Sequence, residues 1–338
     1  MSANISAAEF AASASLYVQE LDVRREALFL VRLEPSQYRA ASFLDNRILE
    51  GATAVGWVPY APIEGVAQHV VPLPLHFIFH AGHVGSTLLS RLLDEVPGVL
   101  GLREPLPLRH LADLHDSQGE DDQFRGLLAT MLKLWGRGFA GSKIVVLKAT
   151  SNAGRIGPQV MAACPDARAI HLNLAAEPYI ATLMAGANTR ADLEGMTYER
   201  IARLRRLLGV AVDAAGPLSL GEGAAVAWLS ERFAQEQLRK LGPRIMSLDF
   251  DAWLADIEGG LRQVLAHLAL PADFAKDLAR SPMLTRYAKL PDEHSYSPQL
   301  RRELLDQARH EQGDEIRRGL RFLEVLGSQH AAVAALLG

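Results

Sequence analysis

Cysteine is almost absent from this chain. Among the 338 residues only Cys164 carries a thiol, which excludes an internal disulfide and any cysteine-rich zinc site. The histidines are scattered without the spacing of metal ligands, so we predict no bound metal. A chain with so little cysteine fits a reducing, cytoplasmic location.

The chain also lacks long apolar runs and a large excess of charge of one sign. No stretch approaches the ~20 apolar residues that a membrane-spanning helix needs, and residues 1–15 have neither the basic start nor the apolar core of a signal peptide. The 35 lysines and arginines are balanced by 39 acidic residues. We interpret the short basic cluster at 203–206 as a solvated helix face. We therefore expect neither a membrane nor a nucleic-acid partner.

The chain does contain a regular alternation of strands and helices. With 49% hydrophobic and 22% charged residues, its composition is that of an ordinary globular protein. Short apolar runs indicate strands at residues 76–80, 99–102, 143–147, 169–174 and 244–248, with helical periodicity between them. This order predicts an α/β fold whose largely parallel sheet is covered on both faces.

The chain divides at Pro72 and Pro74 into two predicted parts. Residues 1–74 are expected to form a small, β-rich N-terminal lobe or extension, and residues 75–338 the main domain. Within the lobe we predict strands at 27–31 and 54–58 and a short helix at 39–44. Residues 299–326 are predicted to form one C-terminal helix, whose apolar face packs on the core or mediates a homodimer.

The most informative stretch joins the strand at 76–80 to a helix that starts near Thr87. Two glycines, Gly82 and Gly85, let the backbone curl closely there. A loop between a strand end and a helix start directs N–H groups and a positive dipole end at one point, which is typical of a phosphate site. The alternative is a tight structural turn. The candidate ligand-binding residues are Gly82, His83, Val84, Gly85, Ser86, Thr87 and Leu88.

The loop differs from that of nucleotide hydrolases. When Gly85 is aligned with the second glycine of G-x-x-x-x-G-K-[ST], Ser86 stands where the lysine is required. Two later strands end in Lys148 and Asn173, where a magnesium-binding aspartate would be needed. ATP or GTP hydrolysis is therefore disfavoured.

The sequence resembles bacterial sulfotransferases over roughly residues 75–325. The segment 83–89 (H-V-G-S-T-L-L) is similar to their phosphosulfate loop, which often reads R-S-G-S-T-L-L, and Arg103-Glu104-Pro105 is similar to their R-E-P. Weaker similarities lie at 245–254, 260–271, 287–289 and 296–298. The resemblance implies a three-layer P-loop fold of the nucleotide-hydrolase type. It also implies sulfuryl transfer from 3′-phosphoadenosine 5′-phosphosulfate to a hydroxyl or amine of a small-molecule acceptor. Two alternatives stay open: a non-catalytic nucleotide- or phosphate-binding protein, and a kinase-like phosphotransferase.

Three residues at strand ends are candidates for catalysis. Glu104, held extended before Pro105, is the expected general base, although an ion pair with Arg103 would also explain it. Lys148 ends an apolar strand and could replace the missing loop lysine; the alternative is an ion pair at the sheet edge. Arg103 is an equal candidate for this cation.

The sequence departs from the sulfotransferase pattern at two basic positions. His83 takes the place of the usual loop lysine or arginine, and Asn173 stands where the resemblance implies an arginine for the donor's 3′-phosphate. Thr182 can stand for the serine of that site. Candidates to compensate for the arginine are Arg190, Arg286 and Lys289. His80 is interpreted as a packing or hydrogen-bonding residue, and the acceptor is expected to contact loops at 105–125 and 186–223.

Overall fold

A five-stranded parallel sheet forms the centre of the protein. The computed structural model describes residues 7–209, 217–285 and 297–337. The sheet contains β4 (Leu75–His80), β5 (Val99–Arg103), β6 (Ile144–Lys148), β7 (Ala169–Asn173) and β8 (Ile245–Asp249). Its strand order is β5-β6-β4-β7-β8, and every neighbouring pair is parallel. The predicted α/β class with a largely parallel sheet is thus confirmed.

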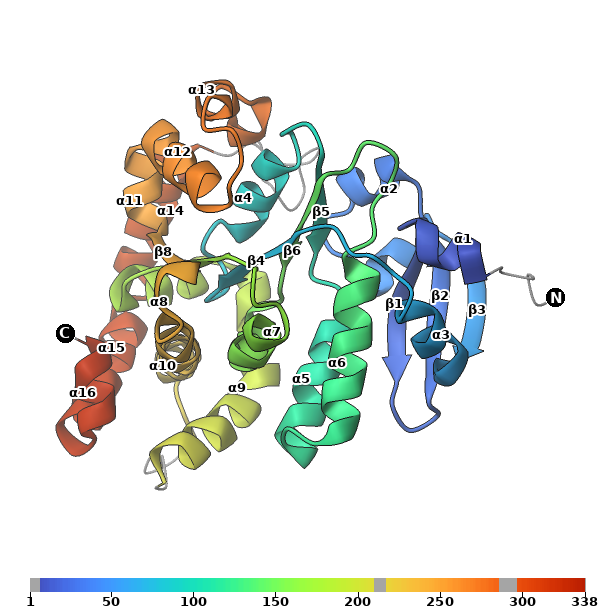
Figure 1. Ribbon diagram of the computed structural model, residues 1–338. Coiled ribbons are helices and arrows are strands. Elements are labelled where there is room, and N and C mark those ends of the chain that lie inside the picture. The colour runs from blue at the N-terminus through green and yellow to red at the C-terminus, as the bar shows by residue number, and fades with distance from the viewer. Residues whose placement is uncertain (1–6, 210–216, 286–296, 338) are drawn as a thin grey trace.

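Both faces of the sheet are buried, as the apolar runs require. In β4, Phe77 and Phe79 belong to one hydrophobic cluster, whereas Ile78 belongs to the other. Helices supply the two outer layers (Figure 1). The face of Ile78 is covered by α4 (Ser86–Leu93), α8 (Ala176–Ala185), α10 (Leu220–Arg239) and α12 (Ile257–His267). The opposite face is covered by α5 (Leu106–Gln118), α6 (Asp122–Trp135) and α7 (Gly157–Ala163).

The N-terminal segment forms a second, antiparallel sheet. Its strands are β1 (Leu16–Asp22), β2 (Ala27–Arg32) and β3 (Thr53–Pro59), in that order. Three short helices accompany them: α1 (Ala7–Ala12), α2 (Pro35–Ala40) and α3 (Tyr60–Ala67). Apolar side chains of this lobe lie in the same hydrophobic cluster as those of α5 and α6. The lobe is therefore β-rich, as expected, and the domain boundary at residue 74 stays a prediction.

Three buried arginines connect the main sheet and its helices to the N-terminal lobe. Arg91 and Arg103 both donate hydrogen bonds to backbone carbonyls of residues 39–41, with Arg103 Nε 2.7 Å from the nearest. Arg137 donates to the carbonyl of Leu16 at 2.7 Å. A buried guanidinium needs hydrogen-bond acceptors, and for these three arginines the backbone carbonyls of the lobe supply part of them.

Several sequence-based boundaries need correction. The helix predicted at 39–44 ends at Ala40, since the carbonyl of Ala41 and the N–H of Leu44 instead form hydrogen bonds with Arg103. The helix predicted at 299–326 is two helices, α14 (Pro298–Glu311) and α15 (Gly313–Gln329), separated by the non-helical Gln312. The expected acceptor loops at 105–125 and 186–223 contain α5 and α9 (Ala187–Leu208).

The remaining elements complete the C-terminal part of the chain. They are α11 (Phe250–Ala255), α13 (Phe274–Leu278) and α16 (Ala331–Leu337). Short 3₁₀ helices lie at Asn46–Glu50, Ser151–Ile156, Gly242–Arg244 and Pro282–Thr285. Among the helices of the described ranges, none is long and apolar enough to cross a membrane.

Candidate functional site

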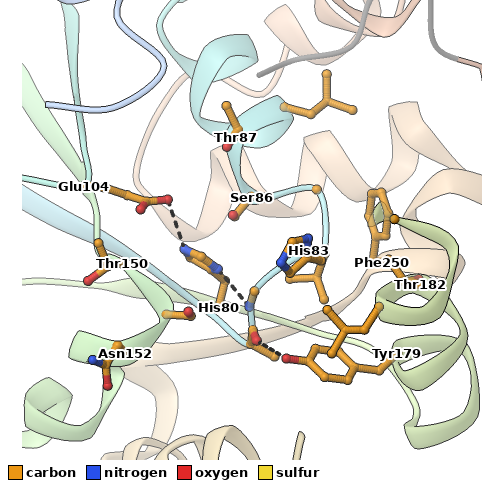
Figure 2. Close-up of a pocket in the computed structure, with 18 of the residues that line it drawn as sticks. His80, His83, Ser86, Thr87, Glu104, Thr150, Asn152, Tyr179, Thr182 and Phe250 are labelled. Carbon is orange, nitrogen blue, oxygen red and sulfur yellow. Dashed lines mark hydrogen bonds and ion pairs between the residues drawn. The ribbon is translucent and has the colours of Figure 1, made fainter. Parts of the chain in front are cut away.

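A cavity of about 670 Å³ opens beyond the carboxyl ends of β4, β5 and β6. Its wall brings together the loop at 81–88, Glu104 and Lys148, which the sequence placed at separate strand ends. Figure 2 shows Ser86, Thr87 and Glu104 around one space, with His80 between the loop and the glutamate. Ligands of open parallel sheets bind at this edge, so the cavity is the candidate site.

The helix that follows the loop starts without a cap. α4 begins at Ser86, and its N-cap residue Gly85 has no side chain to accept from the first amides. The N–H groups of Ser86, Thr87 and Leu88 lie in the first turn and therefore have no intrahelical acceptor. Free amides at the positive end of a helix dipole are typical of sites that bind anions. The structure thus has the local geometry that the loop sequence predicted.

Gly85 is required at its position for two physical reasons. Its φ of 72° lies in the left-handed region, where a side chain is strained. A Cβ added there would lie 2.1 Å from Cε2 of Phe250, on the first turn after β8. The glycine therefore lets the aromatic ring of Phe250 pack against the loop (Figure 2).

His80 fixes the start of the loop. Its Nδ1 accepts from the N–H of Gly82 at 3.0 Å, and its Nε2 lies 2.8 Å from the carbonyl oxygen of Ala149. These partners assign the proton to Nε2 and a neutral ring. The amide of Gly82 is consequently occupied, so Gly82 shapes the loop and does not donate to a ligand there. The interpretation of His80 as a hydrogen-bonding residue agrees with this geometry.

Glu104 and Lys148 form an ion pair in the pocket wall. β6 lies between β4 and β5, and Lys148 is paired with Ile78 on one side and Arg103 on the other. Its Nζ donates a hydrogen bond to Oε1 of Glu104, while the N–H of Glu104 donates to the carbonyl of Lys148 at 2.7 Å. The side chain of Lys148 is 1% exposed and that of Glu104 16%. Only the carboxylate faces the open pocket to an appreciable degree.

The backbone of Glu104 is strained, and the prediction that Pro105 holds this residue extended is wrong. Its φ is 54°, a left-handed value that few residues other than glycine and asparagine adopt. The two hydrogen bonds to Lys148 hold it there. Strained residues cluster at functional sites, where the rest of the fold holds a side chain in a position that costs free energy. A strained candidate base fits this pattern.

Arg103 is not brought into the pocket. Its guanidinium pairs with Asp94 at 3.0 Å and donates to the carbonyls of Tyr38, Arg39 and Ala41. The alternative of an Arg103–Glu104 ion pair is wrong, since Arg103 pairs with Asp94 and Glu104 with Lys148. With all its donors directed into the core, Arg103 has no catalytic role in the site proposed below.

The other predicted ligand residues are placed unequally. His83, Val84 and Leu88 line the cavity, although Val84 and Leu88 are buried in the core beneath it. Thr182 also lines it, and its hydroxyl donates to the carbonyl of Pro178 at 2.7 Å within α8. Arg190 belongs to α9, but its side chain lies outside the described part of the structure. Arg286 and Lys289 lie outside the described residues as well.

Four arginines of the pocket were missed from the sequence, of which Arg47 and Arg109 are exposed. Arg200 on α9 and Arg301 on α14 are both buried and line the cavity. Arg301 pairs with Asp251 at 2.9 Å and lies over the ring of Phe250. Neither follows a strand, which is why a search of strand ends did not find them. The solvated face predicted at 203–206 also needs correction, because Arg203 is buried.

Burial of Tyr179 ties a further helix to the loop. Its hydroxyl donates to the carbonyl of Ala81 at 2.8 Å, as Figure 2 shows. Burial raises the pKa of this phenol well above its usual value, with the nearby charge of Arg200 acting in the opposite direction. Tyr179 therefore stays a hydrogen-bond donor and anchors α8 against the loop.

Comparison with known proteins finds similarity in the solved structures only. No protein-family model and no curated protein matches the chain. The sulfotransferase domain of the Synechococcus PCC 7002 olefin synthase matches with 18% identity and a TM-score of 0.39, covering 74% of this chain and 94% of that one. A sulfotransferase from Alicyclobacillus acidocaldarius matches with 16% identity and a TM-score of 0.38, covering 73% and 94%. A mouse sulfotransferase complexed with PAP matches with 11% identity and a TM-score of 0.36, covering 76% and 92%.

The matched proteins are sulfotransferases, the family that the motifs at 83–89 and 103–105 resemble. Among the described residues, no group of three or more His, Cys, Asp or Glu side chains is placed to hold a metal.

Proposed function

We propose that the protein transfers a sulfuryl group from 3′-phosphoadenosine 5′-phosphosulfate to a hydroxyl or amine of a small molecule. The observation that carries the proposal is the shared pocket of an uncapped helix start, a carboxylate and an ammonium. An anion site alone would suit many phosphate-binding proteins. A base and a cation at the neighbouring strand ends could in addition take up a proton and stabilise developing charge, as a reaction of the bound anion requires.

The donor's phosphosulfate would be held by the first turn of α4. The amides of Ser86, Thr87 and Leu88 and the hydroxyls of Ser86 and Thr87 would donate to its oxygens. These donors are fixed before the ligand arrives, because the loop is held by His80 and Tyr179. Such preorganised donors stabilise charge without reorganising during the reaction.

Glu104 and Lys148 would divide the proton and charge transfers between them. The acceptor's oxygen or nitrogen forms a bond to sulfur and gives its proton to the Glu104 carboxylate. The bond between sulfur and the bridging oxygen breaks, and its electron pair stays on the phosphate as adenosine 3′,5′-bisphosphate leaves. Lys148 lies beside the base and would stabilise the charge that develops on the departing phosphate.

Phosphoryl transfer from ATP is the weaker candidate for this pocket. Nucleotide hydrolases have a lysine in the loop itself, and Ser86 occupies that position here. The cation of this pocket is Lys148, at the end of the strand that pairs with β4.

Calorimetric binding tests the proposal. We expect adenosine 3′,5′-bisphosphate to bind with or without magnesium, and more tightly than ATP or GTP. Incubation of the labelled donor with panels of alcohols and amines should then give a sulfated product, and Glu104→Gln should form it ~10²–10⁴-fold more slowly. Magnesium-dependent binding of ATP in preference to the bisphosphate would favour the kinase-like alternative. Tight bisphosphate binding without transfer to any acceptor would favour the non-catalytic one.

A further inference from the structure

Arg200 is a buried cation that faces the pocket. It lies on α9, is 7% exposed and lines the cavity. The described part of the chain supplies it with no hydrogen bond or ion pair, and its Nε is buried without a partner. A buried guanidinium without a partner lowers the free energy of unfolding, so Arg200 destabilises the protein in the absence of a ligand.

The groups around Arg200 increase the local positive charge. Arg203 donates to Oδ1 of Asn152 at 2.8 Å, and Arg155 donates to the same oxygen at 2.6 Å. The carbonyl of this amide is therefore fully used, and its buried Nδ2 has no partner among the described residues. Arg155 is balanced by Asp113 and Asp116, at 2.5 and 3.0 Å. Within the described residues neither Arg200 nor Arg203 forms a direct ion pair with a carboxylate, although the charge of Glu231 acts on Arg203.

The nearest buried carboxylate compensates this charge only in part. Glu231 on α10 is 2% exposed and forms no direct ion pair with the three arginines among the described residues. Burial raises its pKa to about 7, against the opposing effect of Arg200, Arg203 and Arg155. A carboxyl group that is partly protonated near neutral pH leaves the cluster with excess positive charge.

We propose that this end of the pocket is a second anion subsite, in which Arg200 binds a phosphate, sulfate or carboxylate group. The first anion is held at the start of α4, and the two subsites lie in the walls of one cavity. The inference rests on the proposed function for the identity of the first ligand. The second group belongs either to the donor nucleotide or to the acceptor. Arg301 also has a buried Nε without a hydrogen-bond partner, but it is not assigned this role, because Asp251 lies 2.9 Å away and balances its charge.

Arg200→Gln tests the subsite, with Arg302→Gln as the matched control. Arg302 is an exposed arginine of α14 outside the cavity, so both variants lose one positive charge. Adenosine 3′,5′-bisphosphate and AMP are titrated into each protein, and inorganic phosphate into each protein saturated with the bisphosphate. A charge-assisted hydrogen bond lost in Arg200→Gln should weaken the affected titration by about 10–100-fold. Arg302→Gln should match the wild type.

The titrations distinguish the two sources of the anion. If the group is on the nucleotide, Arg200→Gln loses affinity for the bisphosphate and keeps that for AMP. If it is on the acceptor, both nucleotides bind normally, and the inorganic phosphate site of the saturated wild type disappears in the variant. Either result supports the subsite. An unchanged affinity in all three titrations overturns it.

Two further measurements keep the test decisive. If the wild type binds no nucleotide, the proposed function fails; inorganic phosphate alone should still bind at two sites in the wild type and at one in Arg200→Gln, and equal numbers overturn the subsite. The melting temperature without ligand should be unchanged or higher in Arg200→Gln, because an uncompensated buried charge is removed. A lower melting temperature with unaltered binding shows a structural cation and overturns the proposal.

Should Arg200→Gln not fold, Arg200→Lys keeps the charge without the guanidinium fork and should bind the same probe more weakly than the wild type. Equal binding by Arg200→Lys and the wild type overturns the assignment.

Discussion

Removing either partner of the Glu104–Lys148 pair should have unequal effects on stability. Glu104→Gln takes the carboxylate away from an ammonium that is 1% exposed. Breaking a buried pair in this way costs about 3–5 kcal/mol of the free energy of unfolding, since the remaining charge has lost its hydration. Lys148→Met leaves a carboxylate that faces the pocket and keeps part of its hydration, so we expect a smaller loss of about 1–2 kcal/mol.

The double variant Glu104→Gln/Lys148→Met should be more stable than the sum of the single losses predicts. Both charges are then gone, and the introduced methionine would fill most of the volume of the lysine stem. We expect a coupling energy of about 2 kcal/mol, measured from the midpoints and slopes of urea unfolding. The exposed pair Arg262–Glu258, 2.8 Å apart, is the control, and its coupling should not exceed about 0.5 kcal/mol.

The same variants separate the structural role of the pair from its chemical role. If Glu104 is the general base, Glu104→Gln should lower turnover by ~10²–10⁴-fold, and the double variant should recover stability without recovering turnover. A coupling no larger than that of the exposed control, or a greater loss of stability in Lys148→Met than in Glu104→Gln, would refute the reasoning from burial. Recovery of turnover in the double variant would remove Glu104 from the reaction.

Three further predictions concern the loop and the arginine cluster. Thr87→Ala should weaken binding of adenosine 3′,5′-bisphosphate by about 1.5–3 kcal/mol in calorimetry at an unchanged melting temperature, and equal affinity would exclude the hydroxyl from the site. Gly85→Ala should abolish that binding, because its Cβ collides with Phe250 at a φ of 72°, and Gly85→Ala/Phe250→Ala should recover part of it; binding by the single variant as tight as in the wild type would contradict the clash. For Glu231 the folded pKa of about 7 lies above the ordinary 4.5, so its contribution to stability is complete below pH 4.5 and is lost as the pH rises through 7. Urea unfolding should therefore show the wild type losing up to about 3 kcal/mol relative to Glu231→Gln between pH 5 and 8, and a constant difference would place the pKa elsewhere.

The central sheet was predictable because its strands are short apolar runs with distinct ends. Phe77 to Phe79 is such a run, and burial on both faces leaves little freedom in its assignment. β1 was missed because Gln19 interrupts its apolar pattern; in the structure this side chain is buried and donates to Asn46 at 2.7 Å. α5 was missed because Pro105 and Pro107 indicate a loop, whereas both prolines lie where a helix begins and tolerates them.

Half of the candidate site was predictable for a similar reason. The carboxyl ends of parallel strands meet at one edge, so Glu104 and Lys148 could be placed near the loop before the strand order was known. The ion pair between Glu104 and Lys148 could not be predicted, because it depends on β6 lying next to β5. The backbone acceptors of Arg103 lie more than 60 positions away in the sequence, and no local pattern reveals them. Arg200 escaped for the opposite reason, since an arginine among other arginines on a helix usually faces solvent.

The contacts of Arg103 also bear on how the protein opens. Arg103 directly precedes Glu104, and its guanidinium is bound by the carbonyls that end α2. The N–H of Leu44 returns a hydrogen bond to the carbonyl of Arg103 at 2.6 Å. Detachment of this segment would remove the backbone acceptors of a buried arginine and release the strained backbone at Glu104 at the same time. In hydrogen exchange, the amides around 41–44 and 103–104 should therefore open as one cooperative unit. A protease that cuts between α2 and β3 would then loosen the strand that carries Glu104 without touching the main domain.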